Sequence, residues 1–226
     1  MRKLLVVLVV LGLALVGADR LAHALATDEA EQRLVTEGLT EPSVRVGGFP
    51  FLTQLLSRDF AEVEVDARSL VRDAGRAEDV TATARDVHVQ RGREVTVGEL
   101  SARGVVPYDE VLRRVDLPGL RVVPTADGQV RLRRDVTVLG QTLTVTATAR
   151  VEARGERLRV VPTAFELVDG AAVDDQLASL LVDRFAFSYA LRDLPDGVTV
   201  RRIVPTDEGF AVEVSGRDVS FSDLPG

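Results

Sequence analysis

The chain has 226 residues, no cysteine and a formal net charge of −7 at pH 7. Its length is sufficient for one domain of ordinary size that buries a core without disulfides, and the missing cysteines exclude thiol catalysis and cysteine-ligated metals. The negative charge argues against general binding to nucleic acids, which requires a basic face.

The N-terminus has the pattern of an export leader. Two basic residues precede a run from Leu4 to Ala18 that carries no charged side chain. This run is long for the apolar part of a signal peptide and short for a membrane-spanning helix, which needs about 20 residues. Small-x-small cleavage sites follow at Ala22-His23-Ala24 and Ala24-Leu25-Ala26. Residues 1–26 are therefore either a signal peptide or an uncleaved anchor, and both interpretations place residues 27–226 outside the cytoplasm, on the periplasmic side of the cytoplasmic membrane.

After the leader, the hydrophobic pattern predicts a helix and then a series of strands. Apolar residues recur at helical spacing over about residues 19–38, and Gly38 and Pro42 end the pattern. From residue 44 onward, apolar and polar residues alternate, with the longest alternating run over residues 143–153. Alternation is typical of strands with one buried and one solvated face. Short glycine-containing turns between the runs favour an antiparallel sheet.

Two helices are expected to interrupt the strands. Pro107 stands where the first turn of a short helix over residues 108–115 would begin. A longer helix is predicted over residues 173–185, because apolar residues recur there every three or four positions. Its side chains Leu177, Leu181 and Phe185 are expected to point into the sheet, while Asp175 and Asp183 stay in water.

Catalytic and metal-binding motifs are not convincing in this sequence. Of the two histidines, His23 lies in the leader region and His88 alternates outward between two valines. There is no Gly-x-Ser-x-Gly elbow and no glycine-rich phosphate loop, and the Asp-Gly pairs are typical of turns. We therefore expect no enzyme, no cofactor and no metal, with a paired-carboxylate hydrolase left open as the catalytic alternative.

Aromatic residues make up only 4% of the chain and gather in two clusters. The first follows Gly47 and Gly48, and its predicted lipid contacts are Phe49, Phe51, Leu52, Leu55, Leu56 and Phe60. The second lies around the end of the 173–185 helix, and its predicted lipid contacts are Leu177, Leu181, Phe185, Phe187 and Tyr189. Either cluster forms the lip of a lipid-binding groove or belongs to an ordinary core, and the sequence leaves both alternatives open.

Several segments resemble the LmeA-like phospholipid-binding family of actinobacterial cell-envelope proteins. The resemblance covers nearly the whole chain, and its most specific part is the Gly-Phe-Pro-Phe-Leu-Thr-Gln-Leu-Leu block from Gly48 to Leu56. The other matching segments are Gly17-Ala18-Asp19-Arg20, Phe60 to Val65, Val106-Pro107-Tyr108, Phe185 to Tyr189, Leu194-Pro195 and Gly209 to Val212. The family is similar to tubular lipid-binding proteins. This implies an α+β fold in which a strongly curved antiparallel sheet wraps around a long C-terminal helix, with a phospholipid between them.

The predicted function is extracytoplasmic phospholipid binding, or local lipid transfer, in support of cell-envelope assembly. The expected partners are phospholipid and the membrane surface, with no nucleic acid, and the sequence identifies no protein partner. Ala147, Ala149 and Ala153 are compatible with this function, because small side chains would leave room beside the 173–185 helix. The alternative is a non-catalytic scaffold with a dry core that recruits envelope-biogenesis enzymes.

Overall fold

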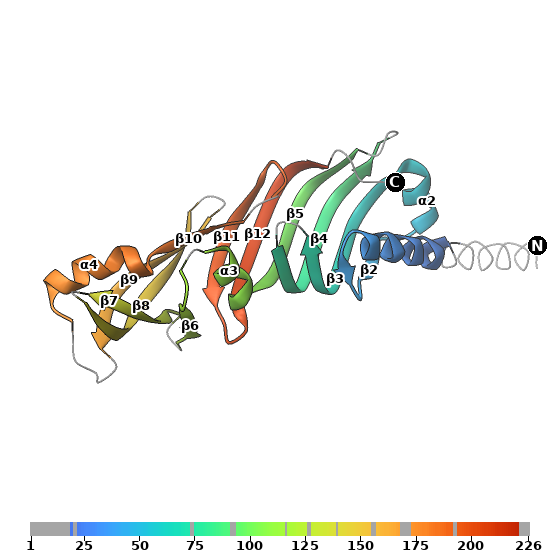
Figure 1. The fold of residues 1–226 in the computed structure, drawn as a ribbon. Coiled ribbons are helices and arrows are strands. Elements are labelled where there is room, and N and C mark those ends of the chain that lie inside the picture. The colour runs from blue at the N-terminus through green and yellow to red at the C-terminus, as the bar shows by residue number, and fades with distance from the viewer. Residues whose placement is uncertain are drawn as a thin grey trace, which may run out of the picture.

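The computed structural model describes residues 19, 22–72, 75–90, 94–115, 117–125, 128–138, 140–154, 157–167, 173–191 and 194–221. In these residues two antiparallel sheets stand end to end, which gives the molecule an elongated shape (Figure 1). A helix over residues 22–36 comes first in the chain. The later elements are β1 (Leu39–Thr40), β2 (Ser43–Gly47), α2 (Phe51–Ser57), β3 (Asp59–Arg72), β4 (Gly75–Val89), β5 (Val95–Pro107), α3 (Tyr108–Arg114), β6 (Arg121–Pro124), β7 (Val130–Val138), β8 (Gln141–Arg154), β9 (Arg157–Leu167), α4 (Asp175–Phe185), β10 (Phe187–Ala190), β11 (Val198–Pro205) and β12 (Gly209–Phe221).

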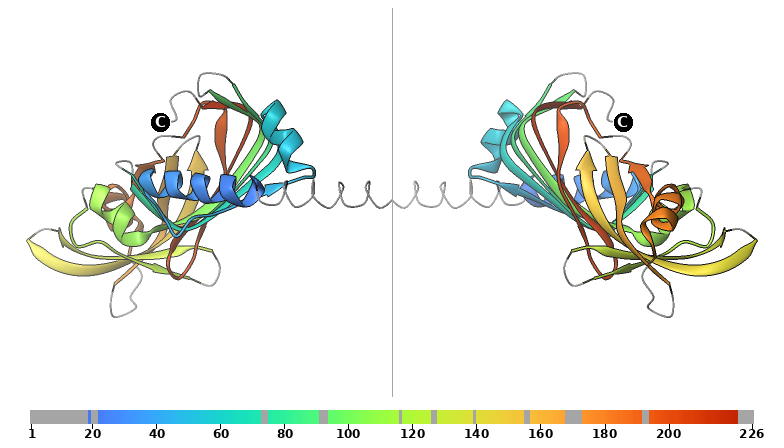
Figure 2. Two further views of the ribbon diagram at one scale, coloured as in Figure 1. Left: turned by 90° about the vertical axis from the view of Figure 1, so that its right-hand side faces the viewer. Right: turned by 90° about the vertical axis from the view of Figure 1, so that its left-hand side faces the viewer.

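The larger sheet has seven strands in the order β1-β3-β4-β5-β12-β11, and β2 pairs with β3 beside β1. Its strands are long and curve as a half-barrel in the end-on views of Figure 2. The alternating sequence pattern gives this sheet one apolar face and one polar face. The predicted curved antiparallel sheet is therefore confirmed.

The smaller sheet has five strands in the order β10-β9-β8-β7-β6 and holds most of the hydrophobic core. Val145, Ala147 and Ala149 on β8 have no exposed surface. Ala147 pairs with Leu132 on β7 and with Phe165 on β9. Close packing thus fills the space that Ala147 and Ala149 were expected to leave for a ligand, and the side chain of Ala153 is exposed.

The expectation of a sheet wrapped around a long C-terminal helix is wrong. Helix α4 has 11 residues and packs against β9 of the five-stranded sheet, at the opposite end of the molecule from α2 (Figure 1). Leu181 and Phe185 are buried as predicted, Leu177 is half-buried and Asp183 is exposed. The helix cannot lie inside a curved sheet because only a narrow stripe of α4 is apolar and buried, and Leu180, outside that stripe, is exposed. A helix enclosed by a sheet must be apolar on all sides.

The N-terminal helix covers the free edge of the seven-stranded sheet at β2. The Val44 N–H donates to Glu31 Oε1 at 2.8 Å, and His23 Nε2 donates to the Val46 carbonyl at 3.1 Å. An edge strand with unpaired backbone groups promotes aggregation, and a covering helix removes that risk. Among the described residues, no helix is long and apolar enough to cross a membrane.

The substitution Leu181→Ala tests the packing of α4. Leu181 is 1% exposed, so we expect the free energy of unfolding to fall by about 2–5 kcal/mol. The control is Leu180→Ala on the same helix, where the side chain is 63% exposed and the change should stay within about 0.5 kcal/mol. Urea denaturation measures both, and equal losses at the two positions would contradict the assigned face of α4.

The phenol of Tyr108 is expected to titrate late. It donates to the Thr206 carbonyl at 2.7 Å, and burial, followed by the nearby charge of Asp207, raises its pKa from 10.0 to about 12. The fold therefore favours the protonated phenol, so this contribution to stability is complete below pH 10.0 and is lost as the pH rises through about 12. Ionisation of the phenols is followed by ultraviolet absorbance as the pH is raised. The difference between the titration curves of the native chain and of Tyr108→Phe gives the titration of Tyr108. A difference midpoint near 10.0 in folded protein would contradict the assignment.

Candidate functional site

The apolar face of the seven-stranded sheet is the most unusual surface of the molecule. Cross-strand pairing aligns Val65, Ala82, Ala102 and Val214 in one row over β3, β4, β5 and β12. A parallel row contains Val63, Ala84 and Leu100. All seven of these side chains are only half-buried.

The five-stranded sheet provides the comparison for this face. Its inward side chains Leu132, Val145 and Val160 have no exposed surface. Helix α3 begins at the end of β5, and α4 packs on β9, while the N-terminal helix lies at the β2 edge. The middle of the seven-stranded sheet is therefore a single layer whose apolar face the described residues leave partly open to solvent. An apolar patch of this kind marks a binding surface.

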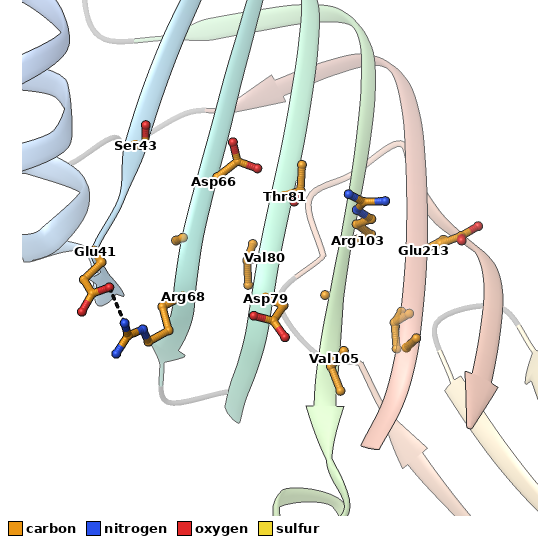
Figure 3. Close-up of a pocket in the computed structure, with 14 residues that line it drawn as sticks. Glu41, Ser43, Asp66, Arg68, Asp79, Val80, Thr81, Arg103, Val105 and Glu213 are labelled. Atoms are coloured by element: carbon orange, nitrogen blue, oxygen red, sulfur yellow. Dashed lines mark ion pairs between the residues drawn. The ribbon is translucent and has the colours of Figure 1, made fainter. Parts of the chain in front are cut away.

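A hollow of about 610 Å³ with both charged and apolar lining residues lies across the larger sheet. Asp66, Thr81, Arg103 and Glu213 face one another there in register on β3, β4, β5 and β12 (Figure 3). Cross-strand neighbours of opposite charge stabilise such a face modestly. The position of these residues follows from the same alternation that puts valine and alanine on the apolar face.

The hollow contains charges of both signs. Arg68 forms an ion pair with Glu41 at 2.8 Å, and Asp66 forms one with Arg45 at 2.6 Å. Among the described residues, Arg103 has no ion-pair partner. The lining contains four carboxylates, on Glu41, Asp66, Asp79 and Glu213, and two guanidinium groups, so the hollow is not a dedicated anion site. Valine and alanine residues also line the hollow, so its surface is of mixed polar and apolar character.

The aromatic block around α2 divides into a buried part and an exposed part. Phe51 is 2% exposed, and its ring contacts the rings of His23 and Phe60 at centroid distances of 4.9 and 6.3 Å. Phe49, Leu55 and Leu56 are 63%, 42% and 84% exposed. The burial of Phe51 favours the core alternative for that residue, whereas its exposed neighbours are available for contact, and lipid contact by this block stays a prediction. Leu52 and Phe60 are half-buried between them.

The second aromatic cluster lies in the core of the five-stranded sheet. Leu181, Phe185, Phe187 and Tyr189 are buried, and the Phe185 ring contacts the Phe165 ring edge to face at 5.6 Å. Figure 1 places this cluster and α2 at opposite ends of the molecule, so the two clusters do not line one cavity. Lipid contact by these residues and by Leu177 stays a prediction, and their burial favours the core alternative.

Most ion pairs among the described residues lie at the surface, and the exception is the buried Glu110, which pairs with Arg113 and Arg114. His88 pairs with Asp59 beside a hollow of about 570 Å³ that Phe49 and Phe60 also line. The described residues contain no group of three or more His, Asp and Glu side chains that is arranged to hold a metal ion. Arg134 donates to the Arg184 carbonyl at the end of α4 at 3.0 Å.

Comparison with protein families gives one match. Residues 17–215 match the family described as LmeA-like phospholipid-binding. No curated protein matches the chain. The matched range includes the N-terminal helix, the α2 block and both sheets except the last part of β12.

The substitutions Phe51→Asp and Leu55→Asp test which residues of the block around α2 belong to the core. At Phe51 an unpaired carboxylate would be buried, which costs several kcal/mol, so we expect unfolding or a large fall in melting temperature. At Leu55 the carboxylate reaches water, and we expect little change in stability. Thermal melts followed by circular dichroism measure both, and comparable losses would show that Leu55 is core as well.

Proposed function

Because this chain belongs to the LmeA-like phospholipid-binding family, we propose that it binds phospholipid outside the cytoplasm and holds or transfers it locally in support of cell-envelope assembly. The observation that carries the proposal is the half-open apolar face of the seven-stranded sheet. The family supplies the ligand class, and the sheet supplies the surface that such a ligand needs. The proposed ligand contacts include Val65, Ala82, Ala102 and Val214.

The size of the side chains supports acyl chains as the occupant of this face. Valine and alanine are short, so the two rows form a smooth surface on which an extended hydrocarbon chain can lie. Each methylene removed from water contributes about 0.8 kcal/mol, so partial burial of one acyl chain supplies several kcal/mol. The charged head group stays in water at the margin of the sheet, where it avoids the cost of desolvation.

The leader supports the proposed location. Positive charge followed by the apolar run from Leu4 to Ala18 is typical of an export signal or anchor. Phospholipid is then available from the outer leaflet of the cytoplasmic membrane. A protein that presents an open apolar face needs such a source close by.

A pair of neighbouring substitutions on β5 tests the lipid-binding face. Ala102 lies on the apolar face and is half-buried, whereas Ser101 lies on the polar face and is exposed. We expect native protein to yield phospholipid on organic extraction and mass spectrometry. Ala102→Glu should lose most of it, and Ser101→Glu should retain it, with melting temperatures confirming that both variants fold. Lipid-free native protein would favour the scaffold alternative.

A reporter fused after Gly226 tests the location. An alkaline phosphatase that folds only outside the cytoplasm should be active in this fusion, because the leader is expected to export the chain. The matched fusion protein without residues 2–18 should be inactive. Activity of a cytoplasm-restricted reporter at the same position would contradict the proposed location.

A further inference from the structure

Three large apolar side chains in and just before α2 are exposed, and we call them the α2 tip. It consists of Phe49 before α2 and of Leu55 and Leu56 in its last turns. Leu56 is 84% exposed, the highest value among the large exposed hydrophobic residues of the described chain. The sequence of α2, Phe-Leu-Thr-Gln-Leu-Leu-Ser, contains no charge, so nothing in the helix itself opposes entry into an apolar phase.

The start of α2 is tied to the end of the leader. Pro50 provides no side-chain cap for α2, and the Leu52 N–H instead donates to Asp19 Oδ1 at 2.6 Å. Asp19 is only 4% exposed, so a buried carboxylate from outside the helix satisfies its N-terminus. Four residues later, the His23 ring packs edge to face on Phe51. A residue before the first cleavage motif and the central residue of that motif are therefore part of the folded domain.

These contacts are relevant to whether the leader is cleaved from the chain. Cleavage after Ala24 or Ala26 would remove both Asp19 and His23. It would leave the Leu52 N–H without its acceptor, uncover the Phe51 ring and free the Val46 carbonyl at the β2 edge. The fold thus uses residues that signal-peptide cleavage would discard.

We propose that residues 1–18 are retained as a membrane anchor and that the α2 tip enters the lipid surface beside it. Asp19 directly follows the apolar run and contacts α2, so the chain meets the membrane next to Phe49, Leu55 and Leu56. Arg58 follows α2 with an exposed side chain, and a cation beside apolar residues suits the interface with anionic lipid. The proposal rests on the proposed extracytoplasmic location but not on lipid binding to the open sheet face.

The chain contains no cysteine, which permits a direct test in the full-length protein. Leu56→Cys and Leu180→Cys each introduce one labelling site, and Leu180, on α4 at the far end of the molecule, is the exposed apolar control (63% exposed). Each variant is labelled with an environment-sensitive fluorophore and reconstituted in phosphatidylglycerol–phosphatidylethanolamine vesicles with or without nitroxide-labelled acyl chains. We expect the label at position 56 to shift to the blue and to be quenched at least threefold more than the label at position 180.

Other outcomes would overturn the proposal. Equal quenching at the two positions would place the α2 tip in water. A blue shift that grows with the amount of protein per vesicle, without quenching by the labelled lipid, would identify a second copy of the chain as the partner of the tip. Asp19→Asn should reduce quenching at position 56, because the neutral amide is a weaker acceptor for the Leu52 N–H. Ala102→Glu should leave this quenching unchanged, so failure of lipid binding by the sheet is distinguishable from failure of membrane docking.

The retained leader has its own measurement. Mass spectrometry of the protein isolated from cell membranes should find N-terminal peptides that contain Asp19 and His23. A mature N-terminus at Leu25 or Thr27 would overturn the anchor.

Discussion

The apolar face of a sheet has to be covered, and the two sheets of this molecule differ in how that requirement is met. In the five-stranded sheet, Phe185 and Leu181 from α4 join the inward side chains of β7, β8 and β9, and the result is a dry core. The seven-stranded sheet has a comparable apolar face built from valine and alanine, but the bulky residues that would close it are absent from its middle. The core, the elongated shape and the proposed ligand surface all follow from this unequal distribution of large side chains.

The composition of the chain explains the distribution. Aromatic residues make up 4% of the sequence, and two of the three helices labelled in Figure 1 have seven residues each. Short helices with few large residues cannot cover fourteen-residue strands such as β3. Phe51 closes one end of the larger sheet, and Val106, Phe210 and Val212 connect the other end to the core. The described residues leave the region between them partly open to solvent.

The strands were largely predictable from the sequence, and the arrangement of the helices was not. Alternation at Val63, Val65, Ala82 and Ala84 identifies strands with one apolar face, because the period of two is a local property. Whether that face meets another part of the chain depends on contacts between distant residues, so periodicity predicted a buried face where a half-open one exists. For the same reason the apolar stripe of α4 was predicted from the sequence, but its packing on the five-stranded sheet was not. The role of Asp19 was also missed, because a carboxylate 33 positions before Leu52, the residue whose N–H it accepts, leaves no local pattern.

The end of β12 lies close to α2 through a chain of backbone pairs. Phe221 pairs with Val95, Val95 pairs with Val89, and the Val89 N–H donates to the Arg58 carbonyl directly after α2. Residues near the first and the last described positions thus lie at the same end of the molecule. The five-stranded sheet lies at the opposite end. The larger sheet lies between these two ends of the molecule. With neighbouring strands about 4.7–4.9 Å apart, its width from β2 to β11 is roughly 25 Å. The larger sheet is therefore also a spacer, which sets how far the five-stranded sheet lies from the end of the molecule that we propose meets the membrane.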